Sequence, residues 1–137
     1  MWWVYALLSA LFAALTAVFA KVGVKNIDSN LATAIRTTII FVLVWGIALF
    51  KGVMPNIKHL EQKTWIFLVL SGCATGLSWL FYFKALQLGK VAQVAPVDKL
   101  SVALAIVLSI AFLGEVLTWK IALGALMIIG GTIVLIV

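Results

Sequence analysis

Five long apolar runs constrain this chain more than any other feature of its sequence. Each run holds about the 20 residues that a helix needs to cross the ~30 Å hydrocarbon core of a lipid bilayer. Membrane-spanning barrel strands are shorter, at roughly 10 residues, and alternate strictly between apolar and polar side chains. The chain is therefore expected to be an all-α integral membrane protein, one domain over residues 1–137, with its termini on opposite sides. The five expected transmembrane helices cover residues 2–20, 31–50, 64–83, 91–113 and 118–137.

Composition excludes a water-soluble domain. Of the 137 residues, 66% are hydrophobic and 10% are charged, whereas soluble domains carry about 25% charged residues. A cleaved signal peptide is the alternative for the first run, but a signal peptide has a basic residue ahead of its apolar part. Here the first lysine, Lys21, follows the run. We therefore expect a membrane span at residues 2–20.

Little in the sequence is typical of an enzyme. Cys73 is the single cysteine and His59 the single histidine, so there is no disulfide pair, no cluster of metal ligands and no nucleophile beside a base. The basic residues are scattered one or two to a loop, where they resemble membrane-surface anchors more than a nucleic-acid-binding patch. We predict a protein that is not an enzyme, uses no cofactor or metal ion, and does not bind nucleic acid.

The loop charges favour neither orientation in the membrane strongly. Lysines and arginines concentrate in cytoplasmic loops, so their distribution predicts which side of the membrane each loop faces. Four loop lysines fall on each side of this chain: Lys51, Lys58, Lys63 and Lys120 on the side of the amino terminus, and Lys21, Lys25, Lys84 and Lys90 on the other. A chain with so weak a bias could insert in both orientations.

The stretch APVDKLS, residues 95–101, places ionisable side chains inside the fourth run. Near the centre of a lipid-exposed helix, Asp98 and Lys99 would each cost roughly 2.5 to 3.5 kcal/mol, so partners or water must be present. Pro96 lacks an N–H, which leaves a carbonyl of the preceding turn without its helical partner and favours a kink. Arg36 enters the second run from the same side as Asp98, and the two side chains could meet. A functional site and a purely structural pair, Asp98 with Lys99 or Arg36, both fit this pattern.

Polar side chains at helical spacing indicate a partly hydrated path through the membrane. Ser71, Thr75, Ser78 and Tyr82 would share one face of the third helix. Single hydroxyls in spanning helices can simply bond to their own backbone, which is the alternative for each of them. The candidate substrate-binding or gating residues are Arg36, Ser71, Thr75, Ser78, Tyr82, Pro96, Asp98, Lys99 and Ser101.

Small residues predict close packing of helices. Gly72 and Gly76 form a G-x-x-x-G pattern in the third run, a spacing that lets two helices approach closely. Gly124, Gly130 and Gly131 in the last run would contact either a neighbouring helix or another chain.

The chain resembles a known family over nearly its whole length. The stretch YFKALQLGKVAQVAPVDKLSVALAIVLSIAFLGEVLTWKIALGALMIIGGTIVLIV is similar to the second part of an EamA domain, of the drug/metabolite transporter superfamily. Arg36 matches the basic residue usual near the start of that family's second helix. The resemblance implies a multi-pass transporter of the bacterial inner (plasma) membrane, often an exporter of amino acids, drug-like solutes or other small metabolites, working by alternating access. The other matching residues are Ala85, Leu86, Gly89, Pro96, Gly114, Glu115, Gly124 and Gly130 or Gly131.

Two departures from the wider superfamily affect this expectation. Typical members carry two five-helix units in opposite orientations, whereas this chain has one, so the resemblance implies an antiparallel homodimer of chains with dual topology. Small multidrug resistance proteins depend on a glutamate in their first helix, and the first helix here has no acid. Asp98 could bind a proton in its place only if its surroundings favoured the protonated form, which the nearby Lys99 and Arg36 oppose.

We therefore expect a transporter of small-molecule substrates. The alternative is a non-transporting accessory subunit or membrane scaffold, in which neutralising Asp98 or Arg36 would disturb assembly alone. A membrane enzyme fits the sequence least, because no catalytic constellation is visible.

Overall fold

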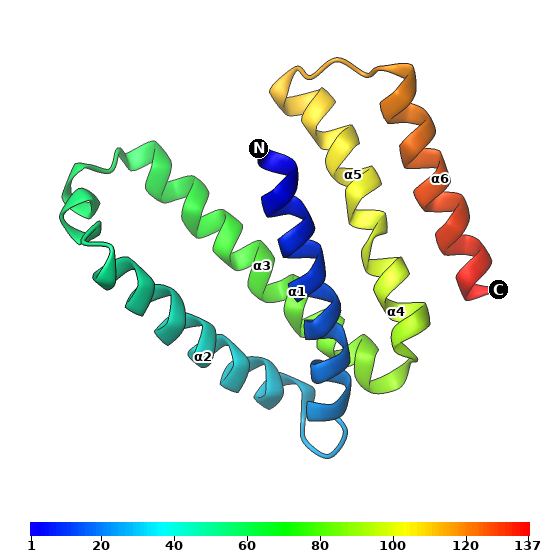
Figure 1. The fold of residues 1–137 in the computed structure, drawn as a ribbon, viewed down its shortest axis with the longest axis horizontal. Helices are drawn as coiled ribbons and strands as arrows, with labels where there is room; N and C mark the ends of the chain where they lie inside the picture. The colour runs from blue at the N-terminus through cyan, green and yellow to red at the C-terminus, as the bar shows by residue number, and fades with distance from the viewer. The chain divides into compact units, whose positions relative to one another are not determined.

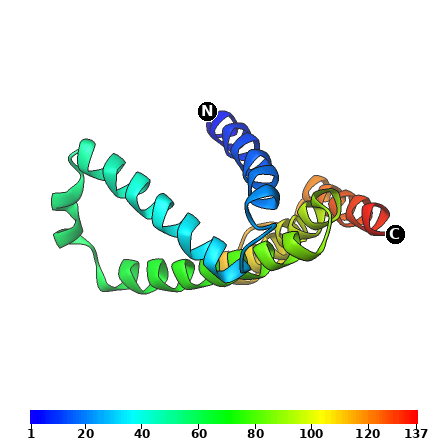
Figure 2. The same ribbon diagram turned by 90° about the horizontal axis from the view of Figure 1, so that it is seen from below.

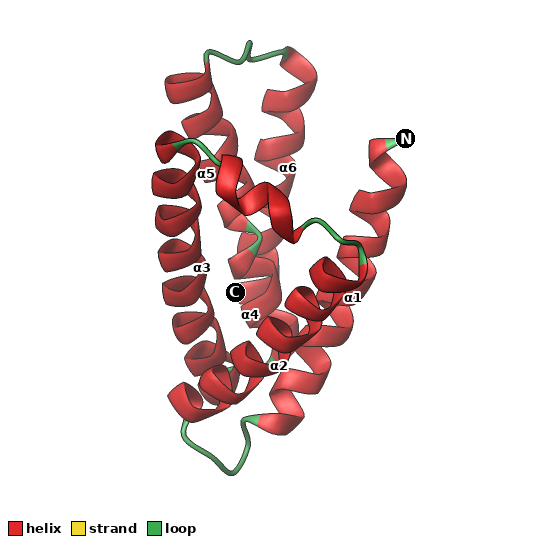
Figure 3. Ribbon diagram, turned by 90° about the vertical axis from the view of Figure 1, so that its left-hand side faces the viewer, coloured by secondary structure: helices red, strands yellow, loops and turns green.

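The structure, a computed structural model, describes residues 1–137 as helices joined by short loops (Figures 1 and 3). Five helical segments are long and apolar enough to cross a membrane: α1, α2, α3, the segment Val91–Leu113, and α6. The predicted all-α membrane fold with five spanning helices is confirmed. In chain order, the elements are α1 (Trp2–Gly23), α2 (Ser29–Phe50), the 3₁₀-helix η1 (Met54–His59), α3 (Gln62–Leu88), α4 (Val91–Asp98), α5 (Leu100–Leu108), the π-helical turn η2 (Ser109–Leu113) and α6 (Trp119–Ile136).

Two of the spans differ from the sequence-based expectation. Helix α3 runs on to Leu88, although the third span was expected to end at residue 83. Residues 84–88 read KALQL, and lysine, alanine, leucine and glutamine are all strong helix formers, so the helix continues until Gly89. The fourth span, expected as one helix over 91–113, is divided into α4, α5 and η2.

The chain forms two compact units. Unit 1 consists of Met1–Val18 and Leu88–Val137, and unit 2 of Phe19–Gln87. One boundary falls inside α1 and the other just before the last residue of α3.

In unit 2, side chains are best buried where α1 ends, α2 begins and α3 ends. Val24 and Leu86 are almost completely buried, together with Ala20 and Phe83. At this end α2 and α3 lie close together, and they diverge toward η1 (Figures 1 and 2). The packed end of unit 2 therefore fixes the start of α2 against the last turns of α3.

Hydrogen bonds hold the same end together. Lys21 Nζ donates to the carbonyl of Leu86 at 2.5 Å. The side-chain nitrogen of Gln87 donates to the carbonyls of Val24, at 3.1 Å, and Ile27, at 2.8 Å. The carbonyls of Val24 and Ile27 belong to the loop directly after α1, where no intrahelical N–H group remains to bond to them. Side chains of α3 thus satisfy the backbone of the α1–α2 connection.

Asp28 determines where α2 begins. Its Oδ1 accepts hydrogen bonds from the backbone N–H groups of Asn30, at 2.9 Å, and Leu31, at 3.2 Å. Aspartate is among the preferred residues at this position because its carboxylate satisfies N–H groups that have no intrahelical partner. The carboxylate of Asp28 is therefore engaged by the backbone of its own helix.

In unit 1, both α4 and α5 pack along α6 (Figure 1). The buried polar residue of α6 is Thr132, which faces α4. The loop between η2 and α6 turns at Gly114, whose φ of 68° lies in the left-handed region that favours glycine. Thr118 caps α6 by accepting a hydrogen bond from the N–H of Ile121 at 3.3 Å.

Most large apolar side chains are exposed. Phe50 is 94% exposed, and Phe81 and Phe112 are also open to the surroundings. In a membrane protein such surfaces contact lipid, because lipid tails are as apolar as the side chains themselves. No other part of the chain lies within 4 Å of a Cβ added at Gly72 or Gly76. The close helix approach expected at these glycines is therefore not made within unit 2.

Candidate functional site

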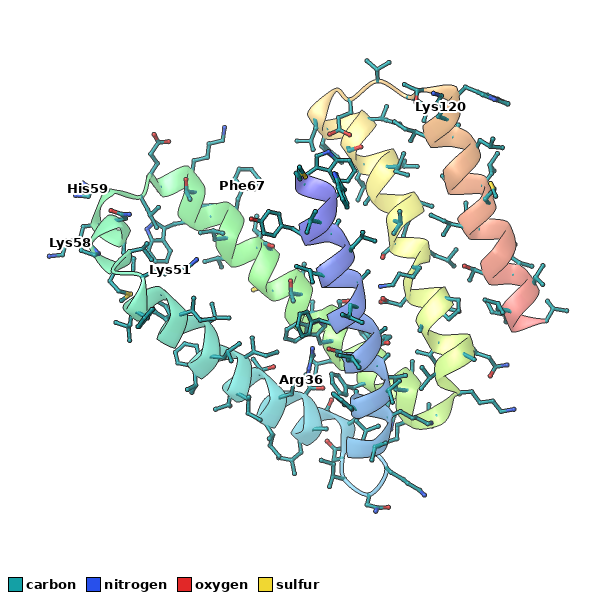
Figure 4. All side chains as sticks on the ribbon, viewed as in Figure 1. Arg36, Lys51, Lys58, His59, Phe67 and Lys120 are labelled. Atoms are coloured by element: carbon teal, nitrogen blue, oxygen red, sulfur yellow. The ribbon has the colours of Figure 1, made fainter.

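Arg36 in α2 lies against two aromatic rings of α3. Its guanidinium carbon is 4.3 Å from the ring centroid of Trp79 and 5.2 Å from that of Phe83. Both distances fall within the ~6 Å range of cation–π contacts. Figure 4 shows the side chain on the side of α2 that faces α3. We call Arg36, Trp79 and Phe83 the cation–aromatic cluster.

The local fold positions this cluster inside a membrane span. Arg36 lies about 10 Å along α2 from its first residue, Ser29, at the helical rise of ~1.5 Å per residue. Trp79 and Phe83 are four positions apart on α3, so their side chains project from one face of that helix. Phe83 is buried and Trp79 is partly buried. The cluster therefore adjoins the packed end of unit 2.

The free energy gained from the two rings does not compensate the cost of placing the charge of Arg36 in the membrane. A charged arginine at the centre of a spanning helix costs roughly 2.5 to 3.5 kcal/mol. Cation–π contacts return about 0.5 kcal/mol when exposed and about 2 kcal/mol when desolvated. The remaining stabilisation must come from water, lipid headgroups or a bound anion at the edge of the guanidinium.

Sequence reasoning missed Trp79 and Phe83. Tryptophans at span ends belong to the interfacial belt of membrane proteins. Trp79 instead lies well inside the third span, one helical turn before another aromatic residue. This position away from the interface was the signal that could have linked the aromatic residues to Arg36.

A second group of residues surrounds a break in the fourth span, between α4 and α5. At Lys99 the backbone N–H is shared between the carbonyls of Ala95, at 3.3 Å, and Pro96, at 3.0 Å, and the N–H of Val102 bonds to the carbonyl of Lys99 at 3.0 Å. This tightening follows Pro96, which cannot donate to the ladder. The sequence predicted a kink at Pro96 within one helix, whereas the irregular turn lies at Lys99, three residues beyond the proline.

Thr132 of α6 stabilises this break. Its hydroxyl is within hydrogen-bonding distance of the carbonyl of Pro96, at 3.2 Å, and of Ile128 in its own helix, at 2.8 Å. Backbone carbonyls at membrane depth need a partner because no bulk water is available. Sequence reasoning missed Thr132, since nothing local to it indicates a contact 36 positions away.

Asp98 and Lys99 pair with each other at the break. Lys99 Nζ lies 3.2 Å from Asp98 Oδ2, and the side chains are 56% and 34% exposed, respectively. A pair of neighbouring residues with this exposure is accessible from outside unit 1. We use the name span break for the group formed by Pro96, Asp98, Lys99 and Thr132. The predicted pairing of Asp98 with Arg36 joins residues of different units and remains a prediction.

The remaining candidates lie on α3, which carries Ser71, Thr75, Ser78 and Tyr82, and on α5, which carries Ser101. The hydrated path expected along the third helix remains a prediction. Ser71, Thr75 and Ser78 are exposed on α3, and Tyr82 is partly buried. The hydroxyl of Thr75 donates to the carbonyl of Ser71 at 2.9 Å, which is the backbone bonding considered as the alternative. The ring of Tyr82 meets Phe83 edge to face, with centroids 6.4 Å apart. Ser101 is exposed on α5.

The cation–aromatic cluster and the span break contain charged side chains and, in the span break, backbone carbonyls. Neither contains a set of metal-binding side chains. The structure has no cluster of three or more His, Cys, Asp or Glu residues able to hold a metal ion. What the groups offer chemically is recognition of charge: a guanidinium held on aromatic rings in unit 2, and an ion pair beside irregular backbone in unit 1. Such features suit the binding of a polar solute.

Comparisons with known proteins bear on the family of the chain. The family model described as the EamA-like transporter family matches residues 1–137. A protein of Sinorhizobium sp., described as an uncharacterised transporter in the cobO 3′ region, is 49% identical over 134 residues, which cover 98% of this chain and 95% of the relative. A protein of Methanocaldococcus jannaschii, described as uncharacterised, is 31% identical over 129 residues, covering 94% of this chain and 91% of the relative. No solved structure matches the chain.

Proposed function

The chain belongs to the EamA-like transporter family, and on that premise we propose that it moves small metabolites across the bacterial inner membrane by alternating access. Amino acids or drug-like solutes are the expected cargo, and export the expected direction. The Sinorhizobium relative, which this chain covers almost completely, is itself described as a transporter.

The observation that carries the proposal is the span break. Many transporters place their substrate and coupling-ion sites where a spanning helix is discontinuous, because the freed backbone groups can coordinate a polar solute. Here the discontinuity coincides with the Asp98–Lys99 pair and with a carbonyl of Pro96 that Thr132 approaches. A fully regular helix would serve a purely structural span better, since irregular backbone at membrane depth is tolerated mainly beside protein or water.

In the proposed cycle, the span break is the element that changes conformation. The Thr132–Pro96 contact holds α4 against α6, and it can be exchanged for a hydrogen bond to water or solute at little cost. Asp98 and Lys99, being partly exposed, can separate so that Asp98 binds a positively charged group of the solute. In unit 1 the hydroxyl of Ser101 would extend this polar surface, and in unit 2 the hydroxyls of Ser71, Thr75 and Ser78 would offer a polar face of α3 to solute.

An antiparallel homodimer would complete the transporter. In inverted-repeat transporters the substrate site lies near the bilayer midplane, between two oppositely oriented halves. The near-equal distribution of loop lysines suits insertion in both orientations. The open surroundings of Gly72, Gly76, Gly124, Gly130 and Gly131 leave small-residue surfaces free for close contact with a second copy.

Transport by purified protein in liposomes tests the proposal. Labelled amino acids and small metabolites are offered to the parent and to Asp98→Asn, which keeps the shape of the side chain but removes its charge. We expect solute uptake by the parent and a loss of roughly tenfold in Asp98→Asn, because the variant loses the charge that pairs with Lys99 and with the solute. The matched control is Glu61→Gln, which neutralises a carboxylate in the loop before α3 and should transport normally.

Two results of this experiment would contradict the proposal. If a correctly folded parent moves none of these solutes, or if Asp98→Asn transports as well as Glu61→Gln, the carrier function assigned to the span break is wrong. An accessory subunit or scaffold would then be the better explanation, with Asp98→Asn affecting assembly only.

A further inference from the structure

The guanidinium of Arg36 contacts the aromatic rings of α3 through its flat face. The guanidinium stacks over Trp79 and Phe83. Its five N–H groups lie in the guanidinium plane, so stacking leaves the donating edge directed past the rings. None of the hydrogen bonds identified in unit 2 uses these N–H groups, although Tyr82 of α3 is close enough to interact electrostatically with the guanidinium. The positively charged edge is thus available to a ligand.

The acidic residues of the chain are engaged or placed elsewhere. Asp28 caps α2 through its Oδ1, and Asp98 is paired with Lys99. Glu61 precedes α3 in the loop at the opposite end of α2, and Glu115 lies in the loop before α6. The α2 and α3 spans themselves contain no acid. An arginine inside a span therefore has no carboxylate of unit 2 to neutralise it.

We propose that the edge of Arg36 binds the carboxylate of the solute, so that the carried substrates are small monocarboxylates, amino acids among them. This inference rests on the proposed transport function. The guanidinium fork matches the two oxygens of a carboxylate in a bidentate arrangement. The rings of Trp79 and Phe83 hold the fork in one orientation, which reduces the entropy lost when the anion binds.

Charge balance favours a carboxylate over a phosphate. One guanidinium neutralises one negative charge, and a phosphate monoester carries about −1.5 to −2 at neutral pH. A phosphate at the cluster would leave excess negative charge inside the membrane, which is costly without a second cation. The cluster supplies Arg36 alone.

Trp79 provides a direct readout of binding. Because its ring lies under the guanidinium, an anion on Arg36 changes the electrostatic field at the indole and hence its fluorescence. The protein is reconstituted in neutral phosphatidylcholine, which excludes anionic lipid headgroups as the ligand. It is titrated with the protein amino acids and a set of short monocarboxylates, each compared with its own amide, and with methyl phosphate.

We expect at least one carboxylate to change the fluorescence saturably, and its amide to bind roughly tenfold more weakly or not at all, because the amide loses the charge-assisted bidentate bonds. Trp79→Phe should lose the fluorescence change and, because a smaller ring then supports the guanidinium, should bind the carboxylate several-fold more weakly by calorimetry. Arg36→Gln should abolish binding. Arg36→Lys keeps the charge but lacks the planar fork and should bind roughly tenfold more weakly.

Lys51→Gln is the matched control, since it removes one positive charge from the other end of the same helix, at its C-cap. It should bind the carboxylate as the parent does. If Arg36→Gln fails to fold, Arg36→Lys and the comparison of acid with amide on the parent still decide the question. Any one of four results overturns the inference. Acid and amide bind equally well, or Arg36→Lys binds as well as the parent. Alternatively, methyl phosphate binds more strongly than the carboxylate, or no carboxylate binds at all.

The two proposals fail in different ways. Transport of amides or cations without carboxylate binding would leave the transport function standing and remove the carboxylate site. Carboxylate binding that depends on Arg36 in a protein that moves no solute would keep the site and remove the transport function.

Discussion

At the scale of single residues, unit 2 depends on a few side chains that bond to backbone far away in the sequence. Gln87 reaches the carbonyls of Val24 and Ile27, and Lys21 reaches the carbonyl of Leu86. The bond from Lys21 satisfies a carbonyl in the last turn of α3, and the bonds from Gln87 satisfy carbonyls of the loop between α1 and α2. These residues determine how firmly the packed end of unit 2, and with it the cation–aromatic cluster, is held.

Replacing Gln87 with leucine tests this dependence. Two carbonyls then lose their side-chain donor, and we expect the free energy of unfolding to fall by about 1 to 3 kcal/mol. Reversible unfolding in mixed detergent micelles measures the change. Gln93→Leu, at an exposed glutamine of α4, is the control and should change stability little. Equal stability of the two variants would contradict the role given to Gln87.

At the scale of elements, the fourth span differs from the others because it is interrupted. Pro96 removes a donor, the turn at Lys99 tightens, and Thr132 supplies a hydroxyl from α6. The spans α1, α2, α3 and α6 are each a single helix. The interrupted span is therefore the element of unit 1 in which the helical hydrogen bonding already departs from the regular pattern, since the Lys99 N–H is shared between two carbonyls.

Pro96→Ala should make the fourth span more regular. Alanine restores the missing N–H and is more favourable than proline inside a helix by about 3 kcal/mol. We expect slower hydrogen exchange at the backbone of residues 96–101 and a lower transport rate with an intact fold. Pro55→Ala is the control, because Pro55 stands at the start of η1, where proline costs no helical hydrogen bond. A faster or unchanged transport rate would argue against a gating role for the break.

Thr132→Val isolates the contribution of α6 to the same element. Valine keeps the branched shape and removes the hydroxyl, so the contact with the Pro96 carbonyl is lost without a cavity. Hydrogen bonds between helices in membranes are worth about 0.6 kcal/mol on average and up to ~1.7 kcal/mol, and we expect a loss of stability in that range. Thr38→Val, whose hydroxyl bonds only to Ala34 of its own helix, is the control. Thermal unfolding followed by circular dichroism measures both.

At the scale of the whole molecule, the proposed antiparallel homodimer makes a prediction about orientation. Combining Lys25→Ala with Asn56→Lys moves the loop charge toward the side of the amino terminus, and combining Lys58→Ala with Asn26→Lys moves it to the other side. We expect each double variant to insert in one orientation, because lysine bias sets topology. Reporters fused to the carboxyl terminus that act on only one side of the membrane measure this.

The two double variants should be inactive when expressed separately and should recover transport when expressed together, since only the mixture supplies both orientations. The parent should place its carboxyl terminus on both sides. A parent with a single orientation, or a fixed-orientation variant that transports alone, would rule out the antiparallel arrangement.

Much of the fold was predictable because it depends on local properties. The five spans follow from apolar runs of sufficient length. Pro96 indicated a kink in the fourth span, but the division of that span into α4, α5 and η2 was not predicted. The predicted end of α3 was wrong because Lys84 is a charged residue of the kind found in loops. Residues 84–88 are nevertheless strong helix formers, and the helix continues through them. Arg36, Pro96, Asp98 and Lys99 were identified as candidates because polar side chains stand out in an apolar sequence.

The sequence by itself determined that this is an all-α membrane protein with five spans and that it resembles the EamA family, because apolar length and residue order can be read without knowing any contact. Only the tertiary structure decided which neighbours the polar residues have. Arg36 stacks on Trp79 and Phe83, and Thr132 lies against Pro96. The physical reason is that such contacts depend on how separate helices are positioned and rotated, whereas periodicity within one helix fixes only which of its side chains share a face.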